Sequence, residues 1–323
     1  MVWYPAYRNY DILINSSYFG GSLLFRASLY MKKWFGYGGI ALTLVACTLK
    51  NPTPADTVCL VTELVRYQQR DDDQQEIGRQ SFAYNNGQLT SYTSTTPDRS
   101  ISFRFDYLGG KIASAYTEDR SIVLSLDYNA LERVEKASYV VNNKEQSVFS
   151  LFYDSVDRTV RLIRLVETRV TLPTNSFIAS RTFQFSYDTI ARNTVDLVSQ
   201  SVQNGYKDGS RTEEELAFEQ SADNHSPFYD SGQAIVLALL ALTNPAEADI
   251  ARYLQRYDCK GFTRKTRNTN GAVILEESSQ FTTSYDGNFN PLQAIQLSRL
   301  SVPADTFPAD RHYRQTYQYN CVE

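Results

Sequence analysis

The sequence predicts a mainly β protein, an antiparallel up-and-down meander that curls into a barrel or half-barrel with one short two-helix segment packed on it. Three observations support this prediction. Six short stretches read as a strand end, a tight turn and a new strand, and the segments between them alternate apolar and polar residues. One region rich in Ala and Leu, at about 233–257, interrupts that rhythm and predicts the helices.

Each of the six stretches contains an apolar residue, a spacer and a tyrosine, followed by turn-forming residues and another apolar residue. Asn, Asp and Gly tolerate the positive φ angles of hairpin turns, so each stretch predicts a hairpin tip. The stretches are "FAYNNGQL" (82–89), "FDYLGGKI" (105–112), "LDYNALERV" (126–134), "LFYDSVDRTV" (151–160), "FSYDTIARNTV" (185–195) and "TSYDGNFNPL" (283–292).

The strands between the tips are two-faced. In "HYRQTYQYNC", Tyr313, Tyr317 and Cys321 share one face, while His312 and Arg314 lie on the other. Such strands are typical of antiparallel sheet with one covered face and one solvated face. We predict about a dozen strands in a single domain over 59–323.

The helical segment "SGQAIVLALLALTNPAEADIARYLQRY" predicts two short helices, Gln233–Leu242 and Pro245–Tyr257. Asn244, Pro245 and Glu247 have the pattern of an N-cap, a first helical position and a capping-box acid. The first helix is apolar on nearly every side, so we expect it to be buried against the apolar face of the sheet.

The N-terminal region has the order of a secretory leader. Met31-Lys32-Lys33 precedes an uncharged apolar run, which is too short to span a bilayer and ends in Leu44-Val45-Ala46-Cys47. This ending resembles the lipobox of bacterial lipoproteins, in which the cysteine is lipidated and becomes the mature N-terminus. We therefore expect residues 1–30 to be an extension outside the fold, 31–46 a signal peptide and 47–58 a lipidated tether.

The tyrosine-centred hairpins resemble the YD repeats of RHS-type proteins. The layout over about 59–321, with "NHSPFYDSGQ" (224–233) and the helices after it, is similar to a family of Bacteroidota lipoproteins of unknown function with a porin-like β fold. The resemblance implies a lipid-anchored location at the cell envelope, at the outer membrane, and implies no activity. In that group of bacteria, Asp-Ser/Thr before a small apolar residue is associated with O-glycosylation, which makes Thr57, Ser155 and Thr189 candidate acceptors.

Three cysteines remain after lipidation of Cys47. If an even number of strands closes into a barrel, the start of the first strand lies beside the end of the last, which predicts a Cys59–Cys321 disulfide and leaves Cys259 as a free thiol. An open half-barrel would separate the two ends and leave Cys259 as a partner for either of the other two.

The sequence gives little support for catalysis. We expect neither of the two histidines, His225 and His312, to act in catalysis, and no metal or cofactor site is predicted. Asp286–Asn290 resembles the start of a calcium loop but lacks the acid at position twelve, which favours a β-turn. Without residues 1–46 the chain carries 28 basic and 35 acidic groups, a net charge of about −7, and this acidic balance argues against a nucleic-acid partner.

We therefore expect a lipid-anchored envelope protein that acts as a non-catalytic binding or structural module. Its abundant tyrosines would either bind carbohydrate or pack as ordinary strand residues. The alternative is a carrier of an apolar ligand such as a lipid or acyl chain, which requires a pocket beneath 233–242. A third possibility, an envelope hydrolase, requires convergent carboxylates in a cleft.

Overall fold

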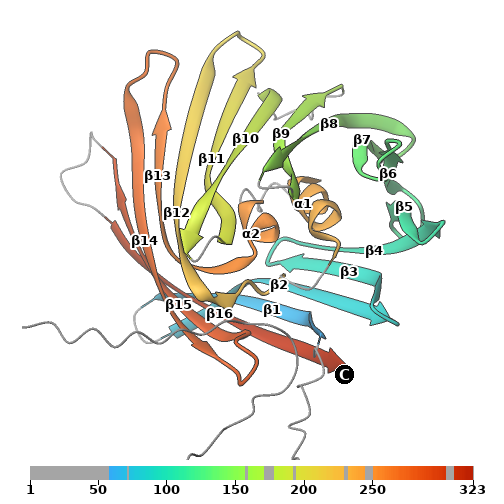
Figure 1. Ribbon diagram of the computed structural model, residues 1–323. Coiled ribbons are helices and arrows are strands. Elements are labelled where there is room, and N and C mark those ends of the chain that lie inside the picture. Colours follow the sequence, from blue (N-terminus) through green and yellow to red (C-terminus); the bar gives the residue numbers. More distant parts are fainter. Residues whose placement is uncertain are drawn as a thin grey trace, which may run out of the picture. The chain divides into compact units, whose positions relative to one another are not determined.

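A computed structural model describes residues 58–70, 73–156, 159–170, 178–191, 194–228, 232–243, 250–302 and 309–322. Over these residues the chain forms a closed antiparallel barrel in which each strand pairs with its neighbour in sequence and β1 pairs with β16 (Figure 1). The strands are β1 Val58–Arg70, β2 Asp73–Asn85, β3 Gln88–Thr96, β4 Arg99–Leu108, β5 Lys111–Tyr116, β6 Ile122–Tyr128, β7 Val134–Val141, β8 Lys144–Val156, β9 Thr159–Arg169, β10 Ile178–Ala191, β11 Thr194–Tyr206, β12 Arg211–His225, β13 Tyr257–Arg267, β14 Val273–Tyr285, β15 Pro291–Ser301 and β16 Ala309–Val322. The predicted meander is confirmed in its closed form, but the expected dozen strands was too few, since sixteen are present in the described residues.

Strands such as β4 and β6 point apolar side chains inward and polar side chains outward, whereas β15 has the opposite pattern, with Gln296 buried and Leu297 exposed. In β4, Phe103 and Phe105 are buried while Ser102 and Arg104 are exposed, and β6 repeats the pattern. A transmembrane barrel has the reverse arrangement, with an apolar band outside. The outward faces of β4 and β6 therefore match contact with water rather than with lipid tails.

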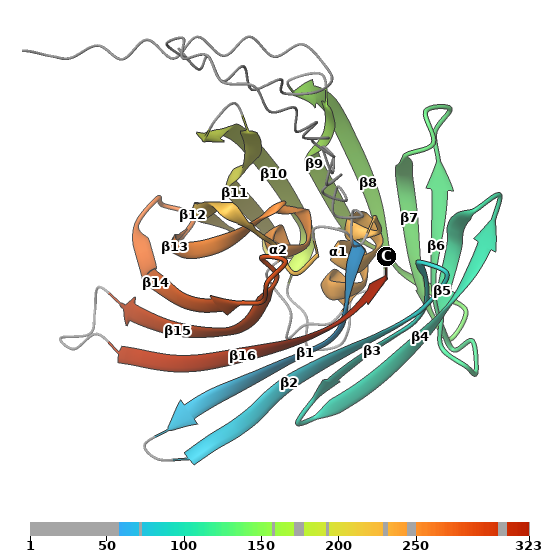
Figure 2. The same cartoon turned by 60° about the horizontal axis from the view of Figure 1, so that its bottom comes forward.

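The interior of the barrel holds two helices, α1 (Ala234–Thr243) and α2 (Ala251–Leu254), which the strands surround in both views (Figures 1 and 2). Every residue of α1 from Val236 to Leu242 is buried, as expected for a helix that is apolar on all sides. It packs into one core cluster with inward residues of the wall such as Leu124, Phe149 and Phe183. The described part of the chain contains no helix long and apolar enough to cross a membrane.

The predicted second helix was wrong in its extent. Residues 244–249 lie outside the described residues, α2 has only four residues, and β13 already begins at Tyr257. The carboxylate of Asp196, on β11, explains where the helix ends. It accepts hydrogen bonds from the backbone N–H groups of Arg256 (3.0 Å) and Tyr257 (3.0 Å), and so holds the chain in the barrel wall there.

The six tyrosine-centred hairpins lie at one end of the barrel, which we call the tyrosine rim. In each of them the pairing register shifts at the tyrosine itself, as at a β-bulge. Between neighbouring hairpins, the strand pairing ends before it reaches this rim. In four cases the tyrosine hydroxyl of one hairpin donates to a backbone carbonyl of the hairpin before it, two residues beyond the last paired residue of that earlier hairpin. These bonds run from Tyr107 to Leu89 (2.8 Å), Tyr128 to Ile112 (2.8 Å), Tyr153 to Val134 (2.8 Å) and Tyr187 to Leu162 (2.9 Å).

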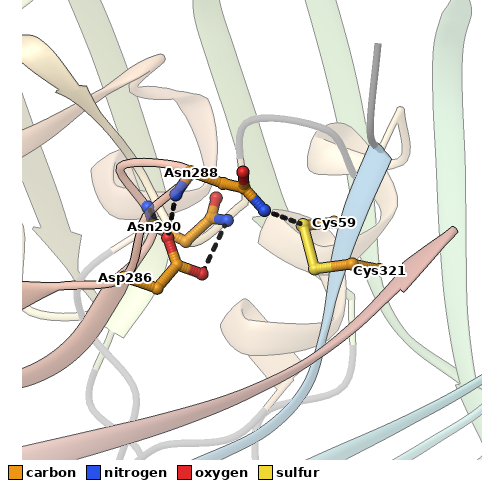
Figure 3. The surroundings of a disulfide bond; sticks show 5 residues. All are labelled: Cys59, Asp286, Asn288, Asn290 and Cys321. Atoms are coloured by element: carbon orange, nitrogen blue, oxygen red, sulfur yellow. Dashed lines mark hydrogen bonds between the residues drawn. A yellow bond between two sulfur atoms is a disulfide. The ribbon is translucent and has the colours of Figure 1, made fainter. Parts of the chain in front are cut away.

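The first and last strands meet at a seam that also reaches the tyrosine rim. Cys59 and Cys321 are directly paired across it and joined by a disulfide, with their Cα atoms 4.0 Å apart. The β14–β15 turn lies beside the seam, where the Asn288 side chain donates to Cys59 Sγ at 3.8 Å (Figure 3). Cys259 forms no disulfide among the described residues, and its thiol donates to the Gly261 carbonyl at 3.1 Å.

Candidate ligand-binding cavity

The core around α1 fills one side of the barrel interior, and a cavity lies on the other side. A cavity of about 350 Å³ lies between α2 and the inner faces of β12 to β16 and β1. Its outermost lining residues, Leu275, Leu300 and Arg311, belong to the strand ends opposite the tyrosine rim, so the cavity extends toward that opposite rim. The volume falls within the range of about 300–1,000 Å³ that is usual for small-molecule sites.

The walls of the cavity combine aromatic rings with charged groups. Rings of β12, β13 and β14 line one side, and tyrosines of β16 line the other. The aromatic lining residues are Phe218, Phe228, Tyr257, Phe262, Phe281, Tyr313 and Tyr317.

Four arginines line the same cavity, against two carboxylates. The arginines are Arg66, Arg252, Arg264 and Arg311, and the carboxylates are Asp258 and Glu277. Glu277 is already engaged, because it pairs with Arg264 (Nη1 to Oε2 3.3 Å) and lies opposite that residue across the β13–β14 ladder. The lining therefore carries an excess of positive charge.

Asp258, at the start of β13, lies at the inner end of the cavity. Burial raises the pKa of its carboxyl group, although the hydroxyl of Tyr285 donates to Oδ2 at 2.7 Å. The same burial, together with the negative charge of Asp258, raises the pKa of Tyr285 to about 12. Tyr317 is shielded from solvent, which raises the pKa of its hydroxyl, and that hydroxyl donates to Gln315 Oε1 at 3.1 Å. Both tyrosines are therefore neutral donors at neutral pH.

A polar network covers the inner face of β14 and β15. The hydroxyls of Ser279 and Ser298 lie 2.6 Å apart across the ladder, and the Gln296 side-chain amide donates to both, at 3.2 and 2.8 Å. These buried polar groups satisfy one another. Of the three, Gln296 lines the cavity, so the inner face here is polar rather than part of the apolar core.

A second cavity, of about 440 Å³, lies at the tyrosine rim between the N-terminal end of α1 and the wall. Tyr107, Tyr128 and Tyr153 line it, but their hydroxyls are the ones that donate to backbone carbonyls. Its charged residues are Lys111 and Glu132, which pair at 2.8 Å, and Arg133. The hydroxyls of these three tyrosines therefore hold the wall together.

None of the described site residues predicted from the sequence lines the cavity beside α2. Cys47 and Thr57 fall outside the described residues. Ser155 and Thr189 are exposed, at the ends of β8 and β10, and each donates its backbone N–H to the aspartate before it, at 2.7 and 2.6 Å. His312 is exposed on the outward face of β16.

The remaining predicted features are structural. The ring of His225, at the end of β12, lies 6.3 Å from that of Tyr257. Asp286 forms the expected turn, because its carboxylate accepts from the backbone N–H groups of Asn288 and Asn290 at 2.8 and 2.9 Å (Figure 3). The described residues contain no group of three or more His, Cys, Asp and Glu side chains that could hold a metal ion.

Sequence reasoning missed the arginines of the cavity. Arg66 and Arg264 each stand two residues from an inward apolar residue, Leu64 and Phe262, so the alternation places them on the inner face. An inward charge within an otherwise apolar strand face was the available signal.

Comparison with known proteins supports the fold. No protein-family model and no curated protein matches the sequence. A solved structure of a porin-like protein from Bacteroides uniformis ATCC 8492 is similar with a TM-score of 0.51 at 12% identity, over 80% of this chain and 98% of that chain. A porin-like protein from Bacteroides vulgatus ATCC 8482 gives a TM-score of 0.44 at 11% identity, over 81% and 98% of the two chains. The chain thus shares its barrel fold with the first of these porin-like proteins.

Proposed function

We propose that the protein is a non-catalytic binding protein of the bacterial cell envelope, anchored by lipid at Cys47, that holds a small molecule inside its barrel. The cavity beside α2 carries this proposal, because its lining combines aromatic rings with more arginines than carboxylates. The barrel fold and the lipobox support the location.

The alternative functions fit the interior less well. A carrier of an apolar ligand required a pocket beneath 233–242. Val236–Leu242 are buried in the core, and the cavity at the start of α1 has Lys111, Glu132 and Arg133 in its lining, which an apolar ligand does not match. A hydrolase required two or more convergent carboxylates in a cleft. The cavity contains two, but Glu277 is paired with Arg264 and Asp258 accepts from Tyr285. Both observations favour a binding site over an apolar carrier or a catalytic cleft.

The lipid anchor can be tested independently of the ligand. Metabolic labelling of cells with a fatty-acid analogue should tag the wild-type protein and leave Cys47→Ser unlabelled. Equal labelling of the two proteins would show that the anchor is not at Cys47.

The cavity can be tested by filling it. Ala294 is buried on the cavity wall, so Ala294→Phe should occupy the space, while Ser102→Phe adds the same ring on the outward face of β4. The full-length protein should bind the neutral fluorescent probe N-phenyl-1-naphthylamine, and only Ala294→Phe should abolish that binding. A folded Ala294→Phe variant that binds the probe like the wild type would contradict the proposal.

A further inference from the structure

The hydrogen-bonding groups around the cavity are unbalanced. Arg66 Nε, Arg264 Nε and Gln255 Nε2 are buried, line this cavity, and find no acceptor among the described residues. All three are donors. A buried donor without an acceptor costs about 1–3 kcal/mol, and more when the group is charged. The lining as a whole therefore favours an occupant that accepts hydrogen bonds.

The charged groups of the cavity lining also favour an occupant that is an anion. Arg264 is matched by Glu277, but Arg66 stands opposite Gln315 in the β1–β16 ladder and Gly78 in the β1–β2 ladder, neither of which carries charge. Arg311 is exposed at the end of the cavity nearest the opposite rim. A guanidinium group presents a planar fork of donors that suits a carboxylate, sulfonate or phosphate.

The apolar part of the lining is aromatic and surrounds these donors. Phe262 and Phe281 have ring centroids 6.1 Å apart, and the Arg264 guanidinium lies 5.7 Å from the Phe262 ring. Tyr313 faces them from β16. Rings in this arrangement stack on flat apolar groups.

We infer that the ligand is a small organic anion with a flat apolar part, whose acidic group is bound by Arg66 and Arg311 and whose apolar part lies against the phenylalanines of β13 and β14. This inference rests on the proposed binding function and specifies its ligand class. The acidic group meets the unmatched arginines, and no bond is made or broken in the complex.

A matched pair of probes tests the inference on the full-length protein. 8-Anilinonaphthalene-1-sulfonate and N-phenyl-1-naphthylamine share the same aromatic body, and only the first carries a negative charge. The wild type should bind the sulfonate at least about tenfold more tightly than the neutral probe, the difference expected for one charge-assisted hydrogen bond. Arg66→Gln should remove about tenfold of that preference and leave the affinity for the neutral probe unchanged.

Two further variants keep the result interpretable. Arg104→Gln removes an outward arginine on β4, paired with Glu118, and should change neither affinity. If Arg66→Gln lowers the melting temperature, Arg311→Gln provides the same comparison at an exposed position, where folding does not depend on the side chain.

The outcomes separate this inference from the proposed function. Binding of both probes with equal affinity, in a manner blocked by Ala294→Phe, would overturn the anion preference and retain the binding function. Binding of neither probe would overturn both. A preference for the sulfonate that survives both Arg66→Gln and Arg311→Gln would show that these arginines do not recognise the anion.

Discussion

The hydroxyl of Tyr107 donates a 2.8 Å hydrogen bond to the carbonyl of Leu89, two residues beyond the last pair that joins β3 to β4. The same relationship recurs at three more hairpins of the tyrosine rim. A side-chain hydroxyl thus satisfies a backbone acceptor where the strands diverge.

Replacing one of these tyrosines should therefore cost stability through the hydroxyl alone. Tyr128→Phe should lower the free energy of unfolding by about 1 kcal/mol, because the Ile112 carbonyl loses its donor. Tyr84 is the matched control in the same motif, since its buried hydroxyl has no acceptor among the described residues, and Tyr84→Phe should be neutral or stabilising. Chemical denaturation of the three proteins gives the comparison, and equal losses in both variants would contradict the role of the bond.

The helix inside the barrel should be essential to stability. Leu240 is 1% exposed in the middle of α1, so Leu240→Asp would place an unpaired charge in apolar surroundings at a cost of several kcal/mol. Leu240→Met conserves volume and should cost less than about 1.5 kcal/mol. Thermal unfolding measures both, and an unchanged melting temperature for Leu240→Asp would mean that α1 is peripheral.

The segment between β12 and β13 that contains α1 and α2, here called the helical insertion, should depend on Asp196 for its attachment to the wall. Asp196→Ala leaves the N–H groups of Arg256 and Tyr257 without their acceptor, which should cost about 1–3 kcal/mol for each group that stays buried. Asp196→Asn retains one acceptor oxygen and should lose less. Amide hydrogen exchange at 256 and 257 reports the effect directly, and unchanged protection in the alanine variant would remove Asp196 from this role.

Asp258 should make stability depend on pH. Burial raises the folded-state pKa of its carboxyl above the unfolded value, so the folded state binds the proton more tightly. The associated stability is fully present below the unfolded pKa and is lost as the pH rises through the folded pKa. The free energy of unfolding of the wild type minus that of Asp258→Asn should therefore fall with rising pH across that interval. A difference that is flat or rises with pH would contradict the burial effect.

The seam disulfide can be checked by non-reducing peptide mapping of the full-length protein. A linked peptide containing Cys59 and Cys321 is expected, with Cys259 available to a thiol reagent after denaturation. A linked peptide that contains Cys259 would indicate an open barrel.

The fold class could be predicted from the sequence because alternation and turn residues are local signals. The number of strands could not, since the Tyr motif marks turns of one rim only, and the turns at the opposite rim, such as 207–210 and 268–272, share no motif. The end of the second helix could not be predicted from the sequence either. The carboxylate of Asp196 that captures the N–H groups of Arg256 and Tyr257 lies about 60 residues earlier in the chain, beyond any local pattern.

The candidate site was harder to predict from the sequence than the fold. Alternation places Arg66 and Arg264 on the inner face, but it does not show whether the space beside an inner face is filled. That depends on where the insertion between β12 and β13 lies, and α1 fills only the side of the barrel away from these arginines. Packing in three dimensions, which one-dimensional periodicity does not contain, decides where a cavity remains.

The pairing of β1 with β16 has a consequence for the order of folding. All the other pairings join strands that are adjacent in sequence, so they can form while the chain is being synthesised. The seam joins cysteines 262 positions apart, so it forms only after the last strand is present. The helical insertion precedes β13, so it is already present when the last four strands wrap around it. Oxidation of the Cys59 and Cys321 thiols to their disulfide by an added oxidant therefore requires closure, and with the oxidant in excess the rate at which these thiols disappear during refolding reports the closing step of the barrel.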